Sequence, residues 1–137
     1  MKISLQHVGW VTNNLELFEK FWVDILGFKR VWESRLPVEL TQKLFGLSYG
    51  AICRRYELEN ITIEVHKFDE FIEEKKSPFN QFGINHICLL VENRIEFLKK
   101  YNFDSYIYNN PAGHQNIFIR DMEKNWIELR ENLGKIK

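Results

Sequence analysis

The segment His86-Ile-Cys-Leu-Leu-Val-Glu-Asn93 begins with a histidine, continues as an apolar run and ends at an asparagine. The segment His7-Val-Gly-Trp-Val-Thr-Asn13 has the same pattern near the start of the chain. Each half then closes on an apolar stretch with a central glutamate, Ile61-Thr-Ile-Glu64-Val65 and Trp126-Ile-Glu128-Leu129. A weak internal repeat of this kind predicts two units that are built in the same way.

The residues after the first repeat segment predict a helix. Asn13 or Asn14 can accept a hydrogen bond from a free backbone N–H at its start, and Gly27 is suited to the left-handed conformation that ends a helix. The apolar residues recur at helical spacing and are expected to form one buried stripe. They are Leu15, Phe18, Trp22, Ile25 and Leu26.

Three further helices are expected. The second half has a shorter one at Glu96–Tyr101, with Ile95, Leu98 and Tyr101 inward. An extra segment of the first half, Pro37–Gly46, has a proline suited to the first turn and a glycine suited to the end. A brief helix at Asp69–Lys76 is expected to bridge the halves. The residues of the extra helix expected to face inward are Leu40, Leu44 and Phe45.

The other apolar stretches predict strands, and strands combined with segregated helices indicate an α+β fold. We expect a single domain over 1–137, with a first module at about 1–68, a linker at about 69–82 and a second module at about 83–132. The predicted strands are Ile3–Thr12, Ala51–Leu58, Ile61–Phe68, Ile84–Val91, Ser105–Tyr108, Asn116–Arg120 and Asn125–Arg130.

The composition excludes several classes of partner. The 19 basic and 19 acidic side chains cancel, so there is no basic excess to bind a nucleic-acid backbone. Two cysteines, Cys53 and Cys88, do not make a disulfide framework and favour a reducing compartment. The longest apolar run, Ile87–Val91, is far shorter than a membrane helix, and no signal peptide is recognisable. A soluble, cytoplasmic protein is expected.

Four polar residues share one face of the predicted strands. Successive side chains of a strand point to opposite faces, so an apolar face with Trp10, Ile63, Leu89 and Leu129 leaves the four on the other side. If the strands are neighbours in curved sheets, two imidazoles and two carboxylates converge. Such a set suits a divalent ion such as Zn²⁺, Ni²⁺, Co²⁺, Fe²⁺ or Mn²⁺. The four candidate ligands are His7, Glu64, His86 and Glu128.

A structural interpretation stands beside this one. A single histidine or glutamate in a strand is usually solvated or hydrogen-bonded, and the spacing here matches no short metal motif such as H-E-x-x-H. The duplication favours the metal site, because each half has a histidine at its start and a glutamate near its end.

The sequence resembles the vicinal oxygen chelate superfamily, which includes glyoxalase, methylmalonyl-CoA epimerase, bleomycin-resistance proteins and extradiol dioxygenases. Besides the two histidine segments, the resemblance rests on Phe21-Trp-Val-Asp-Ile-Leu-Gly-Phe28, on Gly83-Ile-Asn-His86-Ile87 and on Asp121-Met-Glu-Lys-Asn-Trp-Ile-Glu128-Leu129. The last differs from the family pattern D-P-x-G-x-x-I-E-L, because Met122 and Lys124 replace its proline and glycine.

The resemblance implies paired β-α-β-β-β modules that form a cupped mixed sheet around the metal. His7, Glu64, His86 and Glu128 fall on the family's four ligand positions. It also implies a homodimer.

Two histidines and two glutamates resemble the glyoxalase and epimerase branches, which implies a metal-dependent lyase or isomerase. The expected chemistry is proton transfer next to a carbonyl of a small oxo or thioester substrate, through a metal-stabilised enediolate. Glu128 is the expected proton shuttle, with Glu64 as its partner or a second base. Two alternatives stay open: a non-haem iron dioxygenase that uses His7, His86 and Glu128, and a drug-binding resistance protein without catalysis.

Weaker candidates lie nearby. His66 shares a strand face with Glu64 and is either a substitute ligand or a pocket donor. Arg55 and Arg130 can bind a substrate anion, although solvated surface charge is the default. His114 is expected in a loop at the rim of the cup.

Overall fold

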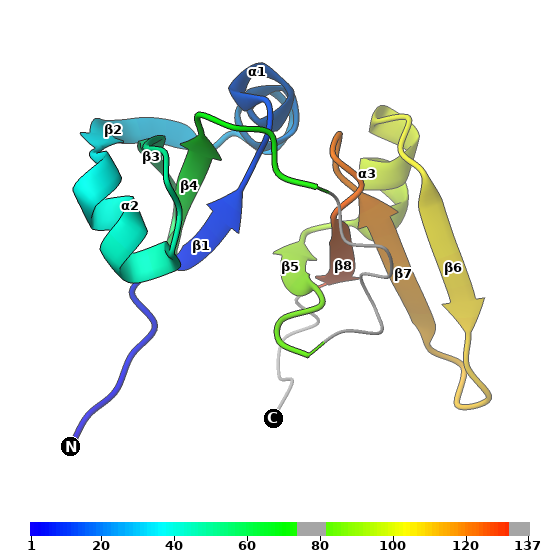
Figure 1. Cartoon of the computed structure of the whole chain (residues 1–137). Coiled ribbons are helices and arrows are strands. Elements are labelled where there is room, and N and C mark those ends of the chain that lie inside the picture. Colours follow the sequence, from blue (N-terminus) through cyan, green and yellow to red (C-terminus); the bar gives the residue numbers. More distant parts are fainter. Residues whose placement is uncertain (74–81, 132–137) are drawn as a thin grey trace. The chain divides into compact units, whose positions relative to one another are not determined.

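The computed structural model describes residues 1–73 and 82–131. The chain divides into two compact units, Met1–Glu74 and Lys75–Lys137, and each contains a four-stranded sheet (Figure 1). Unit 1 consists of β1 (Val8–Val11), α1 (Leu15–Glu19), the π-helix η1 (Lys20–Ile25), β2 (Lys29–Leu36), α2 (Val38–Phe45), β3 (Ala51–Leu58) and β4 (Ile61–Phe68). Unit 2 consists of β5 (Ile87–Val91), α3 (Arg94–Lys100), β6 (Ser105–Asn109), β7 (Gln115–Arg120) and β8 (Trp126–Glu131).

The two sheets have the same topology. The strand order is β1-β4-β3-β2 in unit 1 and β5-β8-β7-β6 in unit 2. In each sheet the first strand runs parallel to the last, and the remaining pairs are antiparallel. The predicted α+β fold with duplicated β-α-β-β-β units is therefore confirmed.

Strand β2 was not among the predicted strands. Its sequence alternates poorly, because Lys29, Arg30, Glu33 and Arg35 are interspersed among its apolar residues. It lies at the edge of its sheet, most of its residues are exposed, and its pairing with β3 shifts register between Arg30 and Trp32. An edge strand with no buried face has no period-2 pattern to detect.

The first helix begins as predicted and then widens. The Asn14 side chain accepts hydrogen bonds from the backbone N–H groups of Glu16 and Leu17 at 3.0 and 3.1 Å. From Lys20 the helix is a π-helix, in which the N–H of Leu26 donates to the carbonyl of Phe21. The wider turn buries both Phe21 and Trp22, whereas a regular stripe predicts only the second of them.

Aromatic side chains fill the core of unit 1. Trp22 is fully buried, and its ring lies 5.3 Å from that of Trp10, 5.6 Å from Phe18 and 5.4 Å from Phe28. The apolar face of β4 adds Ile63 to this core. The buried apolar residues of the unit 2 sheet are Leu89, Ile117, Ile119, Ile127 and Leu129. The predicted apolar faces of the four strands are thus correct.

Helix α2 lies close to its predicted bounds, but its orientation was predicted wrongly. Leu40, Leu44 and Phe45 are exposed, and the buried residue is Thr41. The Thr41 hydroxyl donates to the carbonyl of Tyr49 at 2.6 Å. The helix is therefore held to the following loop by a polar contact, and its apolar stripe remains on the surface.

Other predicted elements are shorter or absent. The first strand begins at Val8 and the fifth at Ile87, a few residues later than expected. Helix α3 buries none of its residues, and Ile95 is exposed. The part of the expected Asp69–Lys76 helix that lies within the described residues, 69–73, is not helical, and its remainder lies outside them. Within 1–73 and 82–131, no helix has the length and apolar character needed to cross a membrane.

The turn before β8 accommodates the two departures from the family pattern. Asp121 is buried, and its carboxylate accepts from the backbone N–H groups of Glu123 and Asn125 at 2.9 and 2.8 Å. Lys124 takes a left-handed conformation with φ of 65°. The turn that the family makes with glycine is therefore formed here with a lysine.

Candidate metal centre

In unit 1, parallel pairing of β1 with β4 brings His7 and Glu64 together. Gly9 lies opposite Glu64 in the register, so His7, two residues before Gly9, projects from the same face as Glu64. Nε2 of His7 lies 4.0 Å from Oε2 of Glu64. Both side chains are partly shielded from solvent, with exposed fractions of 34% and 17%.

Unit 2 repeats this arrangement with β5 and β8. Cys88 lies opposite Glu128, so His86 projects from the face that carries Glu128. Nε2 of His86 lies 3.3 Å from Oε2 of Glu128, whose side chain is only 10% exposed. The structure thus brings each predicted His–Glu pair together within its own unit.

The residue before each histidine is an amide that contacts its other ring nitrogen. Nδ1 of His7 contacts Oε1 of Gln6, and Nδ1 of His86 contacts Oδ1 of Asn85. With Nδ1 against the amide oxygen, Nε2 is the ring nitrogen that faces the carboxylate and is available to a metal ion. Histidines that bind metals are usually oriented by a hydrogen bond of this kind.

Each pair meets the requirements of two ligands on one ion. Imidazole nitrogens and carboxylate oxygens bind Zn²⁺ at about 2.0–2.2 Å, so two of them on one ion lie roughly 3–3.5 Å apart. The His86–Glu128 separation of 3.3 Å falls in this range, and the His7–Glu64 separation of 4.0 Å requires only a small side-chain movement. Neutral imidazoles and ionised carboxylates also suit a borderline divalent ion.

An arginine holds the carboxylate of each pair. Nε of Arg55 donates to Oε2 of Glu64, and Nε of Arg130 donates to Oε1 of Glu128, both at 2.9 Å. The desolvation of Glu64 would raise its pKa, but hydrogen bonds from Arg55 and His66 outweigh it, and the pKa lies below its ordinary value. The hydrogen bond to Glu128 raises the pKa of Arg130. Both arginines therefore contact candidate ligands, although their side chains remain 36% and 49% exposed.

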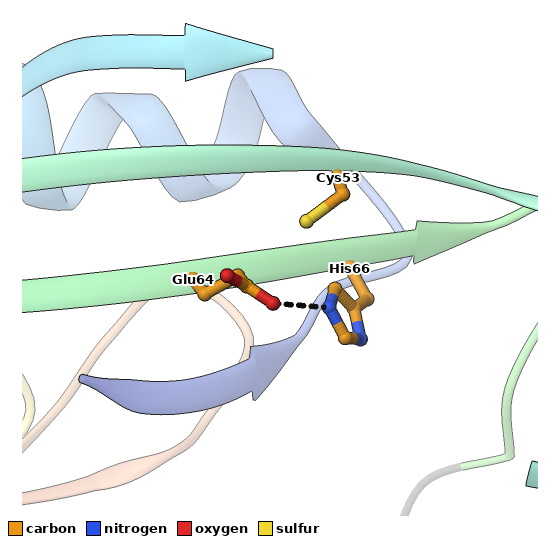
Figure 2. Close-up of side chains that lie close together, drawn as sticks. All are labelled: Cys53, Glu64 and His66. Atoms are coloured by element: carbon orange, nitrogen blue, oxygen red, sulfur yellow. Dashed lines mark hydrogen bonds and ion pairs between the residues drawn. The ribbon is translucent and has the colours of Figure 1, made fainter. Parts of the chain in front are cut away.

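The side chains of Cys53 on β3 and His66 on β4 lie close to that of Glu64 (Figure 2). One ligand atom from each of Cys53, Glu64 and His66 lies within 4.8 Å of the others. Nε2 of His66 lies 3.2 Å from Oε1 of Glu64. The sequence singled out His66 as a candidate ligand but not Cys53, because the two are brought together only by the register that places Cys53 opposite His66.

His114 takes no part in either pair. It is exposed in the turn between β6 and β7, where its backbone N–H donates to the side chain of Asn110 at 3.0 Å. Its placement in a loop agrees with the sequence prediction.

No family model matches the sequence, and no curated protein matches it. Solved structures do. A glyoxalase family protein from Bacillus cereus has a TM-score of 0.76 and 18% identity over 96% of this chain and 95% of its own. A glyoxalase family protein from Enterococcus faecalis has a TM-score of 0.73 and 22% identity over 93% and 97%. The trypanothione-dependent glyoxalase I of Leishmania major has a TM-score of 0.64 and 19% identity over 95% of this chain and 87% of its own.

The likeness to these structures extends over nearly the whole chain. At such identities it establishes the fold alone, which is the fold of these glyoxalase structures. The resemblance drawn from the sequence motifs is therefore confirmed at the level of the fold, and the activity rests on the site.

Proposed function

We propose that this chain is a divalent-metal-dependent lyase or isomerase that moves a proton next to a carbonyl group. The observation that supports it best is the repeated pair, with Nε2 of a histidine turned toward a glutamate oxygen at 4.0 Å in unit 1 and 3.3 Å in unit 2. The proposed ligands of one ion are His7, Glu64, His86 and Glu128. The similar structures include glyoxalases, a glyoxylase/bleomycin resistance/dioxygenase domain and fosfomycin resistance proteins, so the choice of this reaction class rests on the ligand set.

A divalent ion held by these side chains would act as a Lewis acid and stabilise negative charge on a substrate oxygen. Glu128 is the proposed proton shuttle. It is buried, and Arg130 fixes one of its oxygens at 2.9 Å, so the second oxygen has a defined direction in which to take and return a proton. Glu64, held by Arg55 at 2.9 Å, is its partner or a second base.

The proposed substrate is a small oxo compound or a thioester. We further propose a homodimer without nucleic acid or membrane as partner, in the cytoplasm. Two exposed edge strands support self-association, since β2 and β6 present apolar side chains. They are Val31, Trp32, Tyr106, Ile107 and Tyr108.

The first test is the metal content of the purified protein after dialysis against trace divalent ions. We expect tightly bound divalent ions in the wild type, and a loss of more than tenfold in affinity for the ion of this centre in His86→Ala, because each imidazole is a direct ligand. His114→Ala removes an exposed loop histidine and serves as the matched control. Failure of the folded wild type to retain any divalent ion would overturn the proposal.

The second test follows the reaction. Exchange of the proton next to the carbonyl with solvent deuterium is measured by NMR over a panel of 2-oxo compounds, their thiol adducts and acyl thioesters. We expect exchange with at least one class, and its loss in Glu128→Gln with the fold retained. Full exchange in Glu128→Gln would remove the proton shuttle from this residue, and uptake of oxygen with a catechol would replace the lyase by the dioxygenase.

A further inference from the structure

We propose that Cys53, Glu64 and His66 form a second cation site, selective for thiophilic divalent ions such as Zn²⁺ and Co²⁺. The site lies entirely within unit 1, on strands β3 and β4, and goes beyond the metal centre proposed above. It differs from that centre in its ligand chemistry, because it adds a sulfur atom to one imidazole and one carboxylate.

The strand register produces the cluster. Cys53 is paired with His66 across β3 and β4, and Glu64 lies two residues before His66, so the three side chains project from one face (Figure 2). Their ligand atoms lie within 4.8 Å of one another, and Nε2 of His66 is 3.2 Å from Oε1 of Glu64. Sulfur and nitrogen ligands of one tetrahedral zinc ion lie about 3.5 Å apart, so small side-chain movements complete the site.

The surroundings favour a bound ion. Cys53 is 1% exposed, and the side chains of Glu64 and His66 are 17% and 16% exposed, so few water molecules compete for the ligand positions. The rings of Phe45 and Phe68 lie 5.8 and 6.0 Å from that of His66 and limit its movement. One thiolate and one carboxylate balance the charge of a divalent cation.

The two oxygens of Glu64 divide its roles. Oε2 accepts from Arg55 at 2.9 Å and faces His7 at 4.0 Å, whereas Oε1 faces His66. An ion held by Cys53 and His66 would therefore engage Oε1, on the side of the carboxylate away from Arg55.

Cobalt(II) is the probe, because a thiolate ligand adds an intense charge-transfer absorption in the near ultraviolet that nitrogen and oxygen ligands do not produce. We expect this absorption on titration of the full-length wild type and its loss in Cys53→Ser. Cys88→Ser removes the other cysteine and is the matched control. His66→Asn keeps the sulfur and should weaken cobalt binding at this site at least tenfold, a result that does not depend on how well Cys53→Ser folds.

The double variant His7→Ala/His86→Ala separates the two proposals. It removes two ligands of the proposed metal centre, yet the thiolate absorption should persist, because neither histidine belongs to this cluster. Absence of the absorption from folded wild type, its survival in Cys53→Ser, or its loss in Cys88→Ser would each overturn the second site.

Discussion

Asn85 holds the ring of His86 from the neighbouring position, with its amide oxygen against Nδ1, the nitrogen that faces away from Glu128. Gln6 stands in the same relation to His7. An amide therefore precedes the histidine in both units and contacts its ring. These amides give the proposed metal centre a property that can be tested without knowing the substrate.

Replacement of Asn85 by leucine should weaken the binding of a divalent ion about 10- to 100-fold, because the imidazole loses the contact that fixes its tautomer and direction. Competition against a chelating dye measures the affinity. Asn85→Asp retains an oxygen acceptor and should stay within a few-fold of the wild type. An equal loss of metal affinity in both variants would show that Asn85 does not act through an oxygen acceptor for His86.

Thr41→Val should lower the free energy of unfolding by about 1–3 kcal/mol, since it leaves the carbonyl of Tyr49 without its 2.6 Å partner in a buried place. Urea denaturation gives the value. Thr62→Val makes the same atomic change at a half-buried strand position and should change stability by less than about 0.5 kcal/mol. A neutral Thr41→Val would mean that α2 is held mainly by other contacts.

Gly50→Ala should destabilise the protein by about 1–3 kcal/mol, because a Cβ there would lie 2.7 Å from the carbonyl oxygen of Leu36. Gly9→Ala places a methyl group where nothing lies within 4 Å and is the control for stability. Thermal unfolding of the two variants, followed by circular dichroism, compares them directly. A melting temperature of Gly50→Ala equal to or above that of Gly9→Ala would contradict the prediction.

Lys124→Gly should raise the free energy of unfolding by about 1 kcal/mol, because glycine takes the left-handed conformation of this turn without the steric cost that a lysine incurs. Chemical denaturation measures the gain. A stability loss would indicate that the lysine side chain makes a contact that outweighs the backbone strain.

Asp69→Asn should make the free energy of unfolding depend less steeply on pH under acidic conditions. Two hydrogen bonds from Arg35, one of them 2.7 Å long, hold the pKa of Asp69 below its ordinary value of 3.8 despite some desolvation. As the pH falls, the carboxyl group of Asp69 is therefore protonated at a higher pH in the unfolded chain than in the folded one. The stabilisation from this ion pair is complete above pH about 4 and disappears as the pH falls through the pKa of Asp69 in the folded protein. Denaturant midpoints between pH 5 and 2 should decline less steeply in the variant.

Much of the fold is predictable from the sequence, because the strands that carry it have one buried face. Leu129 lies between the polar residues Glu128 and Arg130, and period-2 counting along both strands gives the side on which His86 and Glu128 project. The same reasoning fails for β2, which has no buried face, and for α2, whose apolar stripe remains on the surface.

The finer parts of the site depend on contacts between residues distant in the sequence. The pairing of β3 with β4 places Arg55 opposite Glu64, and this register decides that Arg55 contacts Glu64. The same pairing places Cys53 opposite His66. Periodicity reports which face a side chain takes, but register across strands is a tertiary property.

The π-turn at Lys20–Ile25 allows two adjacent rings, Phe21 and Trp22, to enter the same core. In an ordinary helix, consecutive side chains diverge by about 100°, and one of these two would meet water. A relative one residue shorter at this point would therefore have to exchange one aromatic ring for a polar side chain. Among proteins with a common ancestor, the number of residues in this helical segment and the presence of two adjacent aromatic residues in it are therefore expected to change together.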